Sequence, residues 1–110
     1  MIDRAIVPEP GAIRPFHFPH VERSVLSNGL TLLSVDHGGI PLVTARLVLD
    51  GGATRDPAEL AGLAHLTAHT IDSGTSKRDA RSISWALESL GAYFDVGTGW
   101  DTMSISCTAE

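Results

Sequence analysis

With 110 residues, the chain is long enough for one small domain and too short for two. Hydrophobic residues make up 43% and charged residues only 19%, which excludes disorder over most of the length. The net charge of −5 argues against nucleic acid and against an anionic membrane as partners. Because Cys107 is the single cysteine, no internal disulfide can form, and we expect its thiol to be buried in a strand.

The N-terminal part of the chain carries no recognisable targeting or membrane segment. No apolar run is long enough to span a bilayer, and no signal peptide is visible. We therefore expect a cytoplasmic protein by default, or a periplasmic one if a leader is missing from this sequence. Four prolines within residues 1–20 exclude a helix and predict an extended lead-in. Residues 21–110 are expected to form the folded part.

Short apolar runs separated by turns follow the lead-in. Residues 21–26 and 30–35 are predicted to be strands joined by Asn28-Gly29, a pair that accepts the positive φ of a hairpin turn. Residues 42–49, rich in Val and Leu, form the third predicted strand. Since the connections are short, the three strands are predicted to form an antiparallel meander.

Two helices are predicted next. Asp56-Pro57 is typical of a helix start, with Arg55 beside it, and the first helix is predicted to run to about Asp72. The second is predicted over residues 78–90, where apolar residues recur at helical spacing.

Two further strands, residues 93–96 and 102–108, are predicted to close the chain. The second alternates apolar and polar residues, which indicates one buried face, and we expect it to leave a sheet edge unpaired. The whole order predicts an α+β fold, an antiparallel sheet with helices packed on one face. Trp85 and Trp100 could line a peptide groove, but packing in the core or at a turn is the preferred interpretation for both.

A candidate metal site lies on the first predicted helix. His65 and His69 are four residues apart, so both imidazoles project from one face and can bind one zinc ion. The alternative is two polar residues on a partly exposed helix face. In the inverted zinc-protease motif, His-x-x-Glu-His, the glutamate is the general base. Ala68 occupies that position here, and a methyl group cannot accept a proton. Asp72 lies too far along the helix to be the third ligand.

A series of ordered landmarks resembles the pitrilysin/insulinase family of zinc metallopeptidases, the inverzincins, which include the mitochondrial processing peptidase and its bacterial relatives. The landmarks are Asn28-Gly29-Leu30, Gly51-Gly52 followed by Arg55-Asp56, Gly62-Leu63-Ala64-His65, Gly74-Thr75 and residues 87–92. The resemblance covers residues 21–110 and implies the N-terminal part of one metallopeptidase unit. It also implies that His65 and His69 are zinc ligands, that Ala68 replaces the base, and that the third ligand is absent from this chain.

Three functions follow from this resemblance and from the altered motif. The first is a degenerate, non-catalytic homologue, because Leu-Thr-Ala at residues 66–68 resembles non-catalytic bacterial members. It would bind an unfolded polypeptide beside a catalytic family partner, or as part of a longer chain, and hold zinc weakly or not at all. The second is a zinc endopeptidase inactivated by a Glu-to-Ala change at position 68. The third is a structural or metal-binding module. In each case this chain is expected to be inactive as a peptide hydrolase.

Overall fold

The computed structural model describes residues 10–110, and the chain divides into two compact units after Gly39. Residues 10–20 contain no helix or strand. The rest of the predicted lead-in, residues 1–9, lies outside the described residues. Within residues 10–110, no helix is long and apolar enough to cross a membrane.

The first unit contains an antiparallel hairpin of β1 (Val21–Val25) and β2 (Thr31–Val35). Its turn is built as the sequence predicts: Gly29 has a φ of 85°, and the Asn28 side chain accepts a hydrogen bond from the Leu30 N–H at 3.1 Å. The predicted hairpin is therefore confirmed, with strand ends that differ from the prediction by one residue.

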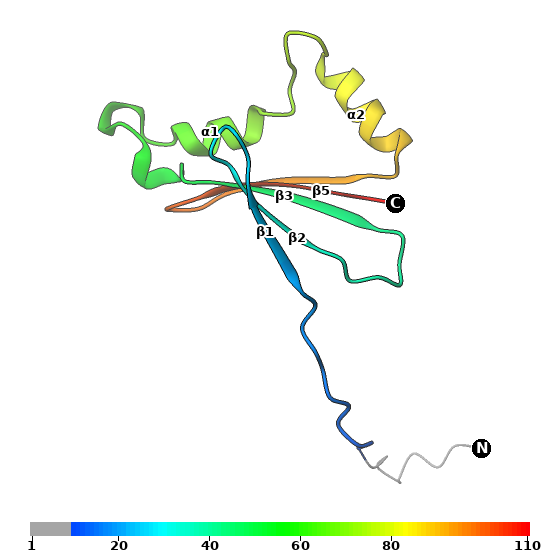
Figure 1. The fold of residues 1–110 in the computed structure, drawn as a ribbon. Coiled ribbons are helices and arrows are strands. Elements are labelled where there is room, and N and C mark those ends of the chain that lie inside the picture. Colours follow the sequence, from blue (N-terminus) through cyan, green and yellow to red (C-terminus); the bar gives the residue numbers. More distant parts are fainter. Residues whose placement is uncertain (1–9) are drawn as a thin grey trace, which may run out of the picture. The chain divides into compact units, whose positions relative to one another are not determined.

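The second unit contains a three-stranded antiparallel sheet in the order β3-β5-β4 (Figure 1). Its strands are β3 (Val43–Leu49), β4 (Tyr93–Thr98) and β5 (Met103–Ala109). The predicted meander is wrong, because β3 pairs along its whole length with β5 and not with β2. The predicted unpaired edge at the last strand is also wrong, since β5 lies between two partners and β3 and β4 are the edges.

The first helix begins later than predicted. Two short 3-10 turns, η1 (Ala53–Arg55) and η2 (Ala58–Leu60), precede α1 (Leu63–Thr70). The extended ψ of 126° at Ala61 and the left-handed φ of 98° at Gly62 prevent a continuous helix from Asp56. Asp56-Pro57 therefore indicates a nearby helix start correctly, but the prediction that α1 begins at these residues is wrong.

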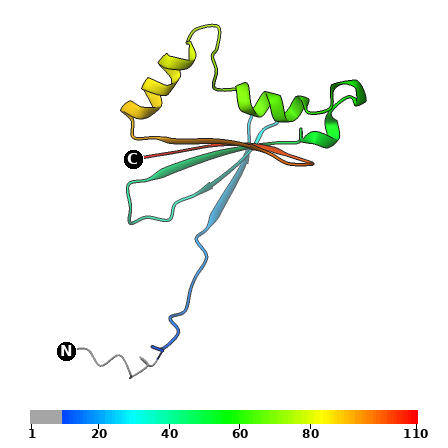
Figure 2. The same cartoon turned by 180° about the vertical axis from the view of Figure 1, so that it is seen from behind.

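The second helix, α2 (Ala80–Ser89), lies within its predicted range. Its N-cap is Asp79, whose carboxylate accepts a hydrogen bond from the Ser82 N–H at 2.8 Å. Both helices lie on the same face of the β3-β5-β4 sheet, as two opposite views show (Figures 1 and 2). The predicted α+β class with helices on one face is confirmed.

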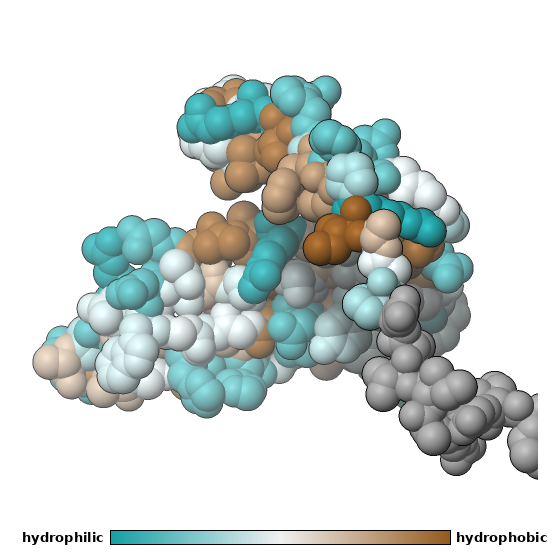
Figure 3. All heavy atoms as spheres, turned by 90° about the horizontal axis from the view of Figure 1, so that it is seen from below, coloured by the Kyte–Doolittle hydropathy of each residue, from teal (hydrophilic) through white to brown (hydrophobic). Residues whose placement is uncertain are grey.

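The core of the described residues is small. Its buried hydrophobic residues are Ala64 and Ala68 on α1 and Met103 on β5, each at most 7% exposed. Many other apolar side chains stay at the surface, where hydrophobic groups lie between hydrophilic ones (Figure 3). Cys107 lies in β5 as predicted, but it is only half-buried.

Candidate functional site

The start of α1 is fixed by a carboxylate from outside the helix. Asp56 lies six residues before the N-cap Gly62 and accepts two backbone hydrogen bonds, from Gly62 at 2.8 Å and from Ala64 at 2.9 Å. These are donors that a helix N-terminus leaves without intrahelical partners, and a negative charge there also complements the helix dipole. The sequence prediction that Asp56 orients this helix start is confirmed, with the cap acting across a loop.

The two candidate metal ligands lie side by side on α1. The ring centroids of His65 and His69 are 4.3 Å apart, with the rings inclined at 63° in an edge-to-face arrangement. Both side chains are exposed. The spacing of four residues thus brings the two imidazoles together on one face, as predicted.

Ala68, at the position that the sequence motif predicts for a base, lies between these histidines in sequence but on a different part of the helix surface. Ala68 is buried together with Ala64, one turn earlier, and both are 7% exposed. Since α1 contacts β4, these two small side chains belong to the packed side of the helix. The predicted base position therefore holds a methyl group that contributes to packing.

The residues present supply only part of a zinc site. Within residues 10–110, no group of three His, Cys, Asp or Glu side chains is arranged to hold a metal ion. Asp72 lies beyond the last residue of α1, Thr70, and adds no third ligand. A catalytic zinc site needs three protein ligands and an open position for water, so the histidine pair does not complete one without further donors.

The segment before α1 is docked on the turn between β4 and β5. Gly52 donates a backbone hydrogen bond to Asp101 at 3.2 Å and Ala53 donates one to Gly99 at 3.0 Å. The Trp100 carbonyl accepts two more, from the Thr54 N–H at 2.8 Å and the Thr54 Oγ1 at 2.9 Å. The 3-10 turn η1 is therefore attached to the sheet that α1 covers.

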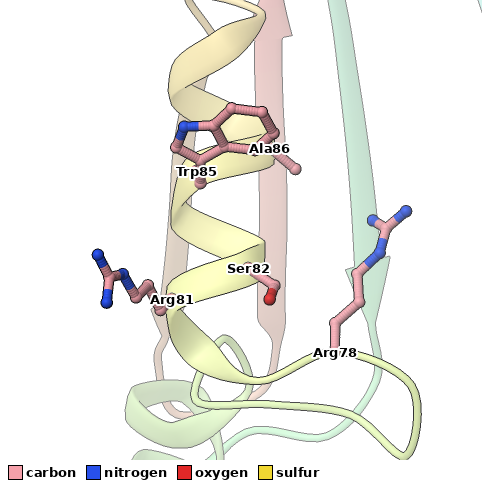
Figure 4. Close-up of a pocket in the computed structure, with 5 residues that line it drawn as sticks. All are labelled: Arg78, Arg81, Ser82, Trp85 and Ala86. Carbon is pink, nitrogen blue, oxygen red and sulfur yellow. The ribbon is translucent and has the colours of Figure 1, made fainter.

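Core packing of Trp85 is contradicted, whereas Trp100 lies at the turn between β4 and β5 as expected, with its side chain exposed. Trp85 is 72% exposed and Trp100 is 78% exposed. Trp85 lines a shallow groove on α2 with Arg78, Arg81, Ser82 and Ala86 (Figure 4). The sequence carried a signal for this groove, because Arg81 and Trp85 are four residues apart and so share a helix face, away from the half-buried Ile83 and Leu87.

The sequence and the fold of this chain are similar to those of known proteins. A sequence model of the family "Insulinase (Peptidase family M16)" matches residues 32–110. The crystal structure of a peptidase M16 inactive domain from Pseudomonas fluorescens is 27% identical, with a TM-score of 0.76 over 82% of this chain. The structure of a protease from Helicobacter pylori is 19% identical and shares the fold, with a TM-score of 0.77 over 84% of this chain.

This chain spans 22% of the length of each of those two solved proteins. No curated protein matches it. The family match nevertheless covers well over half of the chain, from β2 to the last described residue, and includes α1 with its histidine pair. The resemblance noted in the sequence is confirmed, and the chain belongs to the insulinase family of peptidases, family M16.

Proposed function

We propose that this chain is part of a non-catalytic M16 homologue that binds an unfolded polypeptide. The observation that carries the proposal is Ala68, a buried methyl group at the position of the family's general base. The inactive M16 domain from Pseudomonas fluorescens, at 27% identity, supports the same conclusion. Loss of a positioned base alone typically lowers a rate by about 10²–10⁴-fold.

The binding surface that we propose is the outer edge of β4. This strand pairs with β5 on one side only, so its other edge has backbone N–H and C=O groups without a strand partner in the sheet. An extended peptide can add to such an edge as a further strand, with main-chain hydrogen bonds supplying affinity. α1 contacts β4, so the histidine helix packs on the same strand that carries this edge.

This role requires the fold and does not require hydrolysis. A catalytic M16 partner, or further parts of a longer chain, would enclose the same peptide and cleave it. His65 and His69 would then be retained as a partial zinc site, in which the pair binds the ion weakly unless a third donor is supplied from elsewhere.

The experiment is a binding titration of a fluorescent, unstructured peptide, followed by anisotropy. The matched ligand is the same peptide with every backbone nitrogen of the binding segment methylated, which removes the donors of both strand edges and leaves the side chains unchanged. We expect the parent peptide to bind and the methylated peptide to lose most of its affinity. Equal affinity for the two peptides, or no binding of either, contradicts strand addition.

Two proline variants test the strand itself. Successive N–H groups in a strand point to opposite edges, so of Asp95→Pro and Val96→Pro one removes a bond to β5 and the other removes a donor from the outer edge. The variant that keeps the fold is the edge variant, and it is expected to lose peptide binding.

The retained histidine pair favours a second candidate function, a zinc endopeptidase whose base has been replaced by Ala68. The two candidates differ in what a restored carboxylate would do. Cleavage by the Ala68→Glu variant would exclude the first candidate, and a glutamate codon for position 68 in the unmodified gene is expected only for the second.

A further inference from the structure

We propose that Asp56 is a positioning residue for the histidine pair. Its hydrogen bonds join the start of α1 to the segment that is docked on the β4–β5 turn. The inference rests on the proposed role of His65 and His69 as a partial metal site. It assigns to Asp56 a task beyond general stability, namely setting the residue at which the helix begins.

The first step is the rigidity of the segment that carries Asp56. Asp56 directly follows η1, and η1 is held to the β4–β5 turn by the backbone bonds of Gly52, Ala53 and Thr54. The approach is close, because a side chain at Gly52 would overlap backbone atoms of Trp100 and Thr102. The Asp56 N–H also donates to the Ala53 carbonyl at 3.2 Å, which ties the residue to the docked turn.

The second step is the bidentate contact with α1. One carboxylate oxygen of Asp56 accepts from Gly62 and the other accepts from Ala64, so the carboxylate spans the N-cap and the second helical residue. Gly62 has a left-handed φ of 98° at this point. Asp56 therefore holds the junction at which the chain changes from loop to helix.

The third step is the closeness of the ligands to that junction. α1 has only eight residues, and His65 is the third of them. If the first turn frays, His65 leaves the helical geometry that brings its ring to 4.3 Å from that of His69. An eight-residue helix is marginal without external support, so the cap has a direct effect on the pair.

The test compares Asp56→Ala with Asp79→Ala, which removes the cap of α2 and leaves α1 intact. Two quantities are measured on each variant: Zn²⁺ affinity by calorimetry, and the proton–proton NOE between the His65 and His69 rings. Loss of a capping carboxylate typically shifts the helix-start equilibrium about fivefold. We expect Asp56→Ala to weaken Zn²⁺ binding by up to that factor, in proportion to the fraction of chains whose first turn is frayed, and to weaken the NOE, and Asp79→Ala to change neither.

Asp56→Asn is the rescue variant, because its amide oxygen can still accept one of the two backbone bonds. It is expected to lie between the wild type and Asp56→Ala, and it replaces Asp56→Ala if that variant does not fold. Unchanged Zn²⁺ affinity and an unchanged NOE overturn the inference. If the wild type binds no Zn²⁺, the metal part of the proposed function fails, and the NOE alone decides whether Asp56 positions the pair.

Discussion

Gly52 lies so close to Trp100 that the two backbones are in contact, and the space that a Cβ at Gly52 would need is already occupied. Such a Cβ would overlap the Trp100 carbonyl group and lie 2.6 Å from the Thr102 nitrogen. The obstructing atoms belong to the backbone of a hairpin turn, so they cannot move aside as a flexible side chain can. The contact explains why a glycine is needed where η1 docks on the sheet.

We therefore expect Gly52→Ala to destabilise the second unit by about 2 kcal/mol, within the range for overpacking a well-packed site. Gly51→Ala is the control, because a Cβ at Gly51 meets no atom within 4 Å. The measurement is the free energy of unfolding in urea for both variants. Equal free energies for Gly52→Ala and Gly51→Ala would contradict the close approach.

The histidine pair predicts weak, two-ligand metal binding. After dialysis against Zn²⁺, we expect the wild-type chain to retain bound zinc. We expect His65→Ala and His69→Ala each to retain less zinc than the wild type, because each variant leaves a single ligand on α1. His37→Ala is the control, since His37 lies in the other unit. Elemental analysis gives the stoichiometry. Retention of zinc in either α1 variant, or its loss in His37→Ala, would locate the metal elsewhere.

Local features of this fold are predictable from the sequence because their causes are local. Asn28-Gly29 specifies a hairpin turn, since its hydrogen bond spans two residues. The predicted start of the second helix, at residue 78, lies within two residues of the observed start, because its cap Asp79 also bonds locally. The proximity of His65 and His69 could be predicted from helical spacing.

Features that depend on distant partners were not predictable in the same way. β3 follows β2 in sequence, yet its partner is β5, whose residues come only after both helices. The start of α1 depends on a left-handed Gly62 and on a carboxylate six residues earlier, so the helix-start signal at Asp56 was correct in kind and wrong in place. The exposure of Trp85 and Trp100 agrees with the groove-lining alternative and not with the preferred core packing, because large aromatic residues are usually assigned to a core.

Asp79 predicts a pH dependence for α2. Hydrogen bonds from Ser82 to its carboxylate hold the pKa of Asp79 below its ordinary value. The Ser82 side chain has the larger effect and the Ser82 backbone N–H the smaller one. A depressed pKa in the folded state contributes stability that is present above the unfolded-state pKa and is lost as the pH falls through the folded-state pKa. The contribution should thus be complete at neutral pH and decline below about pH 4.

Asp79→Asn removes this titration and keeps an oxygen that can accept the Ser82 bond. We expect its free energy of unfolding in urea to change less than that of the wild type between pH 7 and pH 3. This range includes the ordinary pKa of an aspartate, about 4. Glu88→Gln is the control on the same helix, because within residues 10–110 the Glu88 side chain makes no hydrogen bond. If both variants alter the pH dependence equally, the effect belongs to net charge and not to the cap.

Ala68→Glu tests the proposed non-catalytic role, because it places a glutamate at the predicted base position. Ala68 is buried against the sheet side of α1, so a carboxylate there is partly removed from water without a partner. We expect a loss of about 2 kcal/mol in the free energy of unfolding, while Leu66→Glu, at a position that is already exposed, should cost far less. We also expect no cleavage of a quenched fluorescent peptide, because the described residues still supply only two metal ligands. Cleavage by Ala68→Glu that is abolished by His65→Ala in the same chain would contradict the non-catalytic role and favour the inactivated endopeptidase.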